Sequence, residues 1–182
     1  MQTPSLALVA CLASGLLLSA CSPDHNWREV GFEGMTLKAQ LPCHPDRTTR
    51  SVPMGGAMVD MQVAGCESGT AMLAVMTTAL PVGADANAML AGWQQATLNH
   101  VRVNMPLPAG QSQAWPRAGF LPLASSVRVQ TQGQRADGQA VTVDAVWAAL
   151  AEGERVRLVH AVVYDRQRDP ELVSTLQDSL RP

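Results

Sequence analysis

The sequence predicts an α+β domain in which an antiparallel β-sheet of about five to six strands carries two main helices packed on it. Three observations predict it. Short segments that alternate apolar and polar residues recur along the chain, two other segments have apolar residues at helical spacing, and short turn signals separate neighbouring strands. Because short turns join antiparallel neighbours, these strands are expected to form one antiparallel sheet.

The first half of the chain is expected to supply two or three strands. Residues 35–41 alternate apolar and polar side chains, and Pro42 ends that strand. The polar stretch 46–50 is predicted to be a loop. Segments 57–64 and 70–80 are predicted to be two strands of a hairpin, with a turn at Cys-Glu-Ser-Gly between them.

Two helices are predicted from caps and apolar spacing. Asp85 is the expected N-cap of the first helix, and Asp169 followed by Pro170 is the expected start of the second. The expected buried residues are Leu90, Trp93, Thr97 and Val101 in the first helix and Leu172, Val173, Leu176 and Leu180 in the second.

Three more strands are predicted between the helices. Residues 106–122 contain four prolines and no periodicity, which predicts a long loop. Alternation then predicts strands at 127–131, 141–147 and 156–162, with turns at Asp137-Gly138 and Glu152-Gly153.

The start of the chain has the features of an export signal. The first 20 residues contain no charged side chain, and the apolar run 5–20 is shorter than the about 20 residues that a membrane span needs. The expected organisation is therefore a lipoprotein signal peptide at 1–20, a modified cysteine and tether at 21–26, and a single α+β domain at 27–182.

Leu18-Ser19-Ala20-Cys21 resembles the lipobox of bacterial lipoproteins. The resemblance implies that Cys21 becomes the N-terminus and receives acyl chains such as palmitate. Ser22, which is not Asp, implies anchoring in the outer membrane, facing the periplasm. An ordinary secretory signal and an N-terminal membrane anchor are the alternatives, and MQTPS departs from a usual signal peptide in having no Lys or Arg.

Two of the four cysteines are available for a disulfide, because the predicted signal peptide and lipid anchor account for the other two. Cys11 leaves with the signal peptide and Cys21 carries lipid, so Cys43 and Cys66 are predicted to form a disulfide in an oxidising periplasm. The alternatives are two buried thiols or a metal site that includes His44, which needs further ligands nearby.

The layout resembles the PsbP-like fold, which is shared by a photosystem accessory protein, a Ran-regulating nuclear factor and many small bacterial lipoproteins. The residues that carry the resemblance are the opening strand MTLKAQLPCHP and the closing helix, which starts at Asp169-Pro170-Glu171 and ends at Ser179-Leu180-Arg181. The resemblance concerns the fold, since unrelated functions share this scaffold.

The sequence contains no nucleophile elbow, no Ser-x-x-Lys motif and no Cys-x-x-Cys motif. The one candidate for catalysis is His160 with Asp144 on the neighbouring strand, as in a hydrolase of the envelope. The preferred interpretation of His160 is a core histidine, because it shares its strand face with apolar residues.

Two residue types, methionine and arginine, suggest ligands that the protein could bind. Five methionines, Met54, Met58, Met61, Met72 and Met76, lie close to His44 and could bind Cu(I), but packing is the preferred interpretation because Met72 and Met76 share a strand face with Ala74. Arginine greatly outnumbers lysine, and Arg155, Arg157, Arg166 and Arg168 could recognise phosphate or carboxylate groups, but the preferred interpretation of the alternating pair Arg155 and Arg157 is a solvated strand face.

The leading hypothesis is a non-enzymatic, outer-membrane-anchored periplasmic lipoprotein that binds or helps assemble an envelope component. Its expected partners are the membrane, through the lipid, and an envelope protein. The net charge of −2 argues against nucleic acid. No cofactor or metal is expected. Trp115 and Phe120 in the proline-rich loop are predicted to be exposed anchors of the partner surface.

Overall fold

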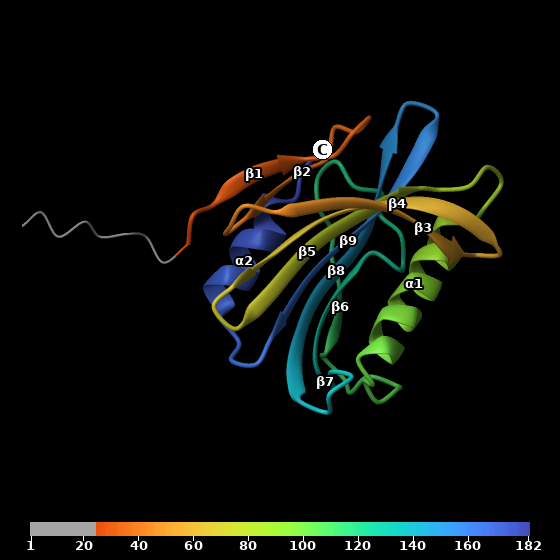
Figure 1. The fold of residues 1–182 in the computed structure, drawn as a ribbon. Coiled ribbons are helices and arrows are strands. Elements are labelled where there is room, and N and C mark those ends of the chain that lie inside the picture. The colour runs from red at the N-terminus through yellow and green to blue at the C-terminus, as the bar shows by residue number, and fades with distance from the viewer. Residues whose placement is uncertain (1–24) are drawn as a thin grey trace, which may run out of the picture.

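The computed structural model describes residues 25–182, which form nine strands and two helices (Figure 1). The helices are α1 (Ala86–His100) and α2 (Pro170–Ser179). The strands are β1 (Arg28–Gly31), β2 (Lys38–Leu41), β3 (Asp46–Met54), β4 (Ala57–Ser68), β5 (Ala71–Ala79), β6 (Ser112–Ala114), β7 (Val127–Gln134), β8 (Ala140–Glu152) and β9 (Arg155–Asp165).

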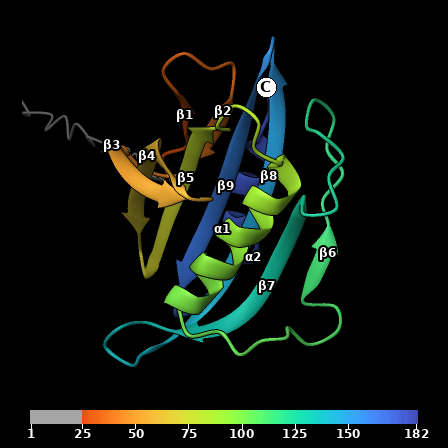
Figure 2. The same cartoon turned by 90° about the vertical axis from the view of Figure 1, so that its right-hand side faces the viewer.

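Seven of the strands form one antiparallel sheet in the order β3-β4-β5-β9-β8-β7-β6. Its two central strands are buried on both faces. Along β8, Val146 and Ala148 belong to the core beneath α2, whereas Trp147 and Ala149 belong to the core beneath α1. Since neighbouring residues of a strand point to opposite faces, the two helices cover opposite faces of the sheet (Figure 2).

Helix α1 begins where the sequence predicts. The Asp85 carboxylate accepts a hydrogen bond from the Ala88 N–H at 2.7 Å and so caps the first turn. The end of the helix rests on β7, because a side chain at Gly133 would place its Cβ 2.5 Å from the Val101 carbonyl oxygen. The buried residues of α1 are Met89, Leu90, Trp93 and Leu98.

The opposite face is covered by α2 together with the two-stranded sheet β1-β2. Asp169 caps α2 by accepting from the Glu171 and Leu172 N–H groups, and Pro170 follows as the first helical residue. The end of the chain then joins β2, since the Lys38 N–H donates to the Arg181 carbonyl at 2.8 Å. The helix and the hairpin therefore form a single layer.

The disulfide between Cys43 and Cys66 is confirmed, with the two Cα atoms 6.2 Å apart. Cys43 lies between β2 and β3, and Cys66 lies in β4. The bond therefore fastens the β1-β2 hairpin to the large sheet on which it packs.

The predicted fold class is wrong. Strands contain 47% and helices 16% of the described residues, so the fold is mainly antiparallel β. A seven-stranded sheet and a separate two-stranded sheet replace the single sheet of about five to six strands with two main helices. The helices are short, with 15 and 10 residues.

The strands that were missed are short or exposed on both faces. Residues 46–50, predicted to be a loop, belong to β3, in which almost every side chain is exposed. The proline-rich loop contains β6, whose three residues are all exposed. Neither segment has a buried face, so neither shows the alternation on which strand prediction depends.

We predict that replacing Cys43 and Cys66 together by serine lowers the free energy of unfolding by about 3 kcal/mol, because the open loop gains conformational freedom in the unfolded chain. Urea unfolding of the double variant and the parent measures this. Equal midpoints would contradict a stabilising role for the bond. The parent treated with a reducing agent is the matched control and should behave as the variant does.

Candidate functional site

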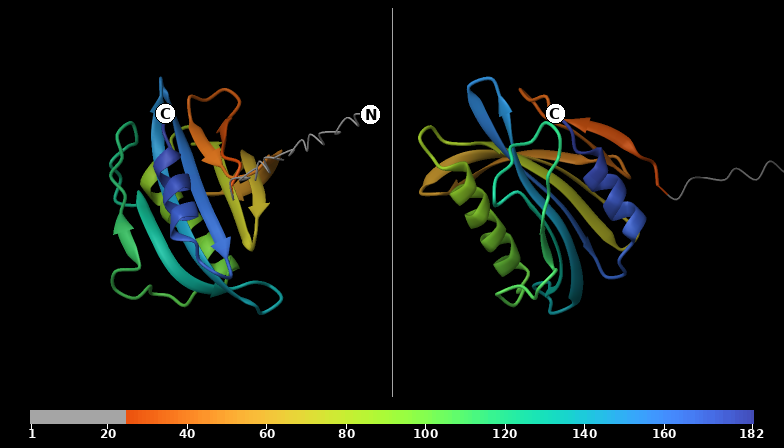
Figure 3. Two further views of the ribbon diagram at one scale, coloured as in Figure 1. Left: turned by 90° about the vertical axis from the view of Figure 1, so that its left-hand side faces the viewer. Right: turned by 180° about the vertical axis from the view of Figure 1, so that it is seen from behind.

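A polar cleft of about 200 Å³ lies between α2 and strands β6 and β7. In the left view of Figure 3, α2 covers the middle of the sheet, and β6 and β7 extend beyond it. The polar side chains that line the cleft are Gln111, Gln113, Arg128, Gln130, Asp144, Arg168, Ser174 and Gln177.

The cleft lies where α2 leaves the face of β6 and β7 uncovered. Along β7, Val129 and Thr131 are buried on the α1 side, whereas Arg128, Gln130 and Gln132 are exposed on the other side. A strand at the edge of the covered area is expected to place long polar side chains on its open face. The result is a row of amides and one guanidinium beside α2.

Strand register gathers the polar side chains from three strands. Arg128 of β7 lies directly opposite Gln113 of β6, and Gln130 lies directly opposite Asp144 of β8. Residues that face each other across an antiparallel pair point to the same side of the sheet. All four side chains therefore belong to the open face.

The strongest electrostatic contact in the cleft is the ion pair between Asp144 and Arg168. The side chain of Asp144 is only 5% exposed, and Arg168 is 31% exposed. The Arg168 Nε donates to both carboxylate oxygens at 3.1 and 3.0 Å, and its Nη2 donates to Oδ1 at 3.0 Å. This fork holds the guanidinium in one orientation at the mouth of the cleft.

The second arginine is held by a neutral group. The Nε and Nη2 of Arg128 donate to the Gln113 side-chain oxygen at 3.0 and 2.6 Å. Two guanidinium groups and one carboxylate leave the cleft with one net positive charge. The cleft therefore favours an anionic group, and its amides can both donate to and accept from a ligand.

A second hollow, of about 340 Å³, lies between α1 and the β3-β4 hairpin. Met54, Met61, Met89 and Trp93 are among its lining residues, and most of the others are apolar or small. Ligand sites combine apolar walls with a few polar groups that orient the ligand. The cleft beside α2 has such groups, which makes it the stronger candidate.

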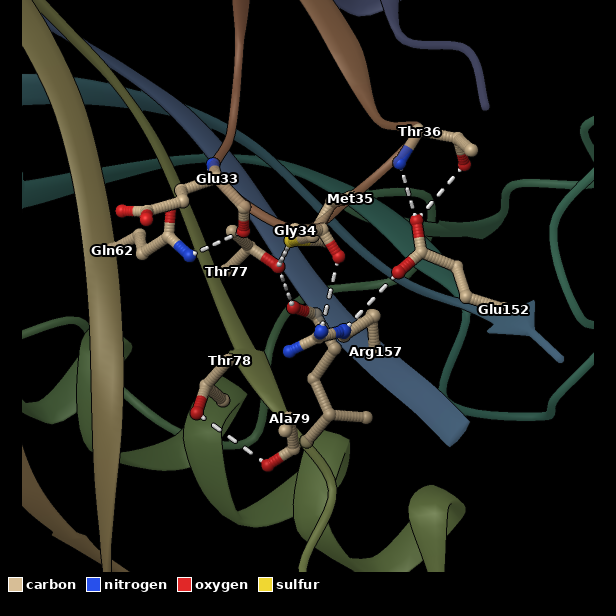
Figure 4. A network of polar contacts seen from close by, with 11 residues as sticks. Glu33, Gly34, Met35, Thr36, Gln62, Thr77, Thr78, Ala79, Glu152 and Arg157 are labelled. Atoms are coloured by element: carbon tan, nitrogen blue, oxygen red, sulfur yellow. Dashed lines mark hydrogen bonds and ion pairs between the residues drawn. The ribbon is translucent and has the colours of Figure 1, made fainter. Parts of the chain in front are cut away.

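A separate cluster of polar residues joins the β1-β2 connection to the large sheet (Figure 4). Glu152 accepts from the Thr36 N–H and hydroxyl and from Arg157, whose Nη2 also donates to the Gly34 carbonyl. Burial raises the pKa of Glu152, but the hydrogen bonds from Thr36 and Arg157 outweigh it and lower the pKa overall. These groups bond to one another, so the cluster is a structural junction.

His160 is a core residue. It is fully buried, stacks on Trp147 with ring centroids 4.4 Å apart, and meets the edge of Trp93 at 5.4 Å. Its Nδ1 donates to the Val146 carbonyl at 3.0 Å. Burial lowers the pKa of His160 to about 4, so the ring is neutral at neutral pH.

The structure does not bring His160 and Asp144 together. His160 lies in the core beneath α1, as its contacts with Trp93 and Trp147 show, whereas Asp144 lines the cleft beside α2. The two side chains are on opposite faces of the sheet, and Asp144 bonds to Arg168 instead. The proposed His-Asp pair is therefore wrong.

Trp115 and Phe120 are not exposed anchors. They are 8% and 9% exposed, pack edge to face with centroids 5.3 Å apart, and belong to the core on the α2 side. Arg117 lies over the Trp115 ring and forms an ion pair with Asp178 at 2.9 Å. The proline-rich loop is thus fastened against the end of α2.

The structure divides the five methionines and the four arginines that the ligand hypotheses grouped together. Met54, Met61 and Met76 pack in the core beneath α1, as the packing interpretation expects. Met61 is buried beneath α1, whereas Met58 is 63% exposed on the other face of β4. Arg157 is near the start of β9 and Arg168 follows its end, so the two arginines are separated by the length of the strand. Among residues 25–182, no group of three His, Cys, Asp or Glu side chains could hold a metal ion.

The anchor residues predicted from the sequence, Cys21 and its lipobox, lie outside the described residues. Within 25–182, neither helix is both long and apolar enough to cross a bilayer.

No protein-family model matches the sequence, and no curated protein matches it either. The resemblances to the lipobox and to the PsbP-like fold therefore stay predictions.

Sequence reasoning missed most of the cleft. Its signal was present, because long polar side chains at Arg128, Gln130, Gln132 and Gln134 occupy alternate positions of one strand. That pattern is also typical of a plain solvated face. These side chains line a cleft only because α2 packs beside them. The local sequence pattern of β7 does not show where α2 packs.

We predict that the free energy of unfolding falls by about 3 kcal/mol as the pH is lowered from about 6.5 to about 4, because unfolded His160, with an ordinary pKa of 6.5, binds a proton that the folded form excludes. Urea unfolding at a series of pH values measures the slope. His160→Gln should flatten it, while the exposed-site control His100→Gln should keep it. An unchanged slope in His160→Gln would contradict the assignment.

We predict that Arg168→Ala lowers the free energy of unfolding by about 2 kcal/mol, because it leaves the buried Asp144 carboxylate without its partner. Arg166→Ala, at an exposed arginine of the same loop, is the matched control and should change stability by less than about 0.5 kcal/mol. The double variant Arg168→Ala with Asp144→Asn should recover part of the loss. Equal midpoints for the two single variants would show that Asp144 does not need Arg168 as a partner.

Proposed function

We propose that the protein is a lipid-anchored binding module of a bacterial envelope, attached through Cys21 to the outer membrane and facing the periplasm. Leu18-Ser19-Ala20-Cys21 supports the anchor, and Ser22 supports the outer membrane. The Cys43–Cys66 disulfide is consistent with an oxidising compartment. Several acyl chains on one cysteine would make the attachment permanent.

The first described residues indicate which end of the domain faces the membrane. His25 contacts Ser68 in the β4-β5 hairpin at 3.2 Å and Asp169 at the start of α2 at 3.6 Å. The three residues between Cys21 and His25 span at most about 14 Å. The β4-β5 turn and the start of α2 are therefore the membrane-proximal end in this proposal, and the cleft opens beside that end.

The polar cleft is the observation that supports a binding function best. It combines a fixed arginine, a second arginine on a neutral partner, and several accessible amides. These groups can hold and orient a polar ligand with an anionic group. A hydrolase that uses His160 and Asp144 has no support, because the two side chains are on opposite faces of the sheet.

We predict that cells fed radiolabelled palmitate label the parent chain, and that Cys21→Ser abolishes the label and releases the protein from the membrane fraction, since the acyl chains provide the attachment. Gel autoradiography and fractionation measure both effects. Ser22→Ala is the matched control and should retain the label. An unlabelled parent chain would overturn the anchor.

The binding surface has its own test. A photocrosslinking amino acid at Gln130, in the cleft, is expected to crosslink to envelope material in living cells, whereas the same group at the exposed Gln95 on α1 is not. Gel shifts of the two variants measure the yields. Equal yields from both positions would contradict the cleft as the contact surface.

A further inference from the structure

The size of the cleft limits what it can hold. Its volume of about 200 Å³ is below the about 300 Å³ at which pockets for drug-sized ligands begin, so it accepts a single sugar ring or amino-acid residue. An adjoining hollow of about 220 Å³ lies along β7 and shares Gly110, Gln111 and Gln130 with the cleft. The two together suit consecutive units of an extended ligand.

The charges in the cleft indicate that the bound part of the ligand is acidic. Asp144 neutralises Arg168, but Arg128 bonds only to the neutral amide of Gln113. Each guanidinium binds its partner through Nε and Nη2, which leaves the Nη1 donors for a ligand. A carboxylate has the planar geometry that such donors match.

The neutral groups favour a saccharide over a peptide. Gln130 is exposed and Gln177 is half-buried, so their amides are accessible from the cleft. An amide both donates and accepts, as do sugar hydroxyls. Extended peptides are instead held by strand edges and by pockets for alternate side chains. Strand β6 is an edge of the sheet, but the polar groups of this cleft are side chains that β6, β7 and β8 place on one sheet face.

We propose that the cleft binds a carboxylate-bearing sugar of an envelope glycan, with the carboxylate on Arg128 and Arg168 and the hydroxyls on Gln130 and Gln177. This rests on the proposed binding function and names its ligand class. Arg128 is the decisive residue, because it is exposed, supplies the net charge of the cleft, and can be removed without leaving a buried charge unpaired.

Calorimetric titration of the full chain in detergent micelles tests the proposal. N-acetylmuramic acid should bind about tenfold more tightly than N-acetylglucosamine, which lacks the 3-O-lactyl group that carries the carboxylate. Arg128→Ala should lose about tenfold in affinity for the acid, and the difference between the two sugars should disappear. Arg155→Ala, at an exposed arginine in the β8-β9 hairpin, is the matched control and should bind as the parent does.

Several results would overturn the proposal. These are equal affinity for the two sugars, no heat with either sugar at concentrations up to about 10 mM, or binding of the dipeptide alanyl-alanine without binding of the acid sugar. The palmitate experiment separates this failure from failure of the anchor. A labelled chain that does not bind the sugar disproves the ligand class alone, and an unlabelled chain that binds it disproves the anchor alone.

Discussion

The burial of β8 and β9 on both faces is the constraint on which the rest of the structure depends. Ten consecutive residues of β8 are buried, so apolar side chains of both parities must be covered. One face is covered by α1, and the other by α2 with the β1-β2 hairpin. These layers are small, with helices of 15 and 10 residues, and they cover the centre of the sheet better than its edges.

The candidate site follows from that incomplete cover. Beyond α2, the open face of β7 must be polar, and the register with β6 and β8 places Gln113 and Asp144 beside Arg128 and Gln130. The loop after β9 brings Arg168 over the buried Asp144 carboxylate. A buried ion pair contributes little net stability, because desolvation of its charges offsets their attraction. Its effect in the cleft is to fix the direction in which the Arg168 donors point.

The sequence predicted most elements that have a buried face, and it missed the four-residue strand β1 and the exposed strands β3 and β6. The caps at Asp85 and Asp169 identify both helices, and alternation or continuous apolar character identifies β2, β4, β5, β7, β8 and β9. The disulfide followed from counting cysteines. β3 and β6 have no buried face, so the predicted fold class held too few strands. Trp115 and Phe120 were predicted to be exposed because proline-rich segments are usually surface loops. The proline-rich segment of this protein instead packs against α2.

We propose that the ligand binds on the open face beside α2 and not on the α1 side of the sheet. Amide NMR of the labelled chain tests it most directly, since each glutamine side chain and each tryptophan indole gives its own signal. Addition of N-acetylmuramic acid should move the side-chain signals of Gln113 and Gln130 and leave the Trp93 indole, which lines the hollow beneath α1, unmoved. Movement of Trp93 with unchanged glutamine signals would contradict the account.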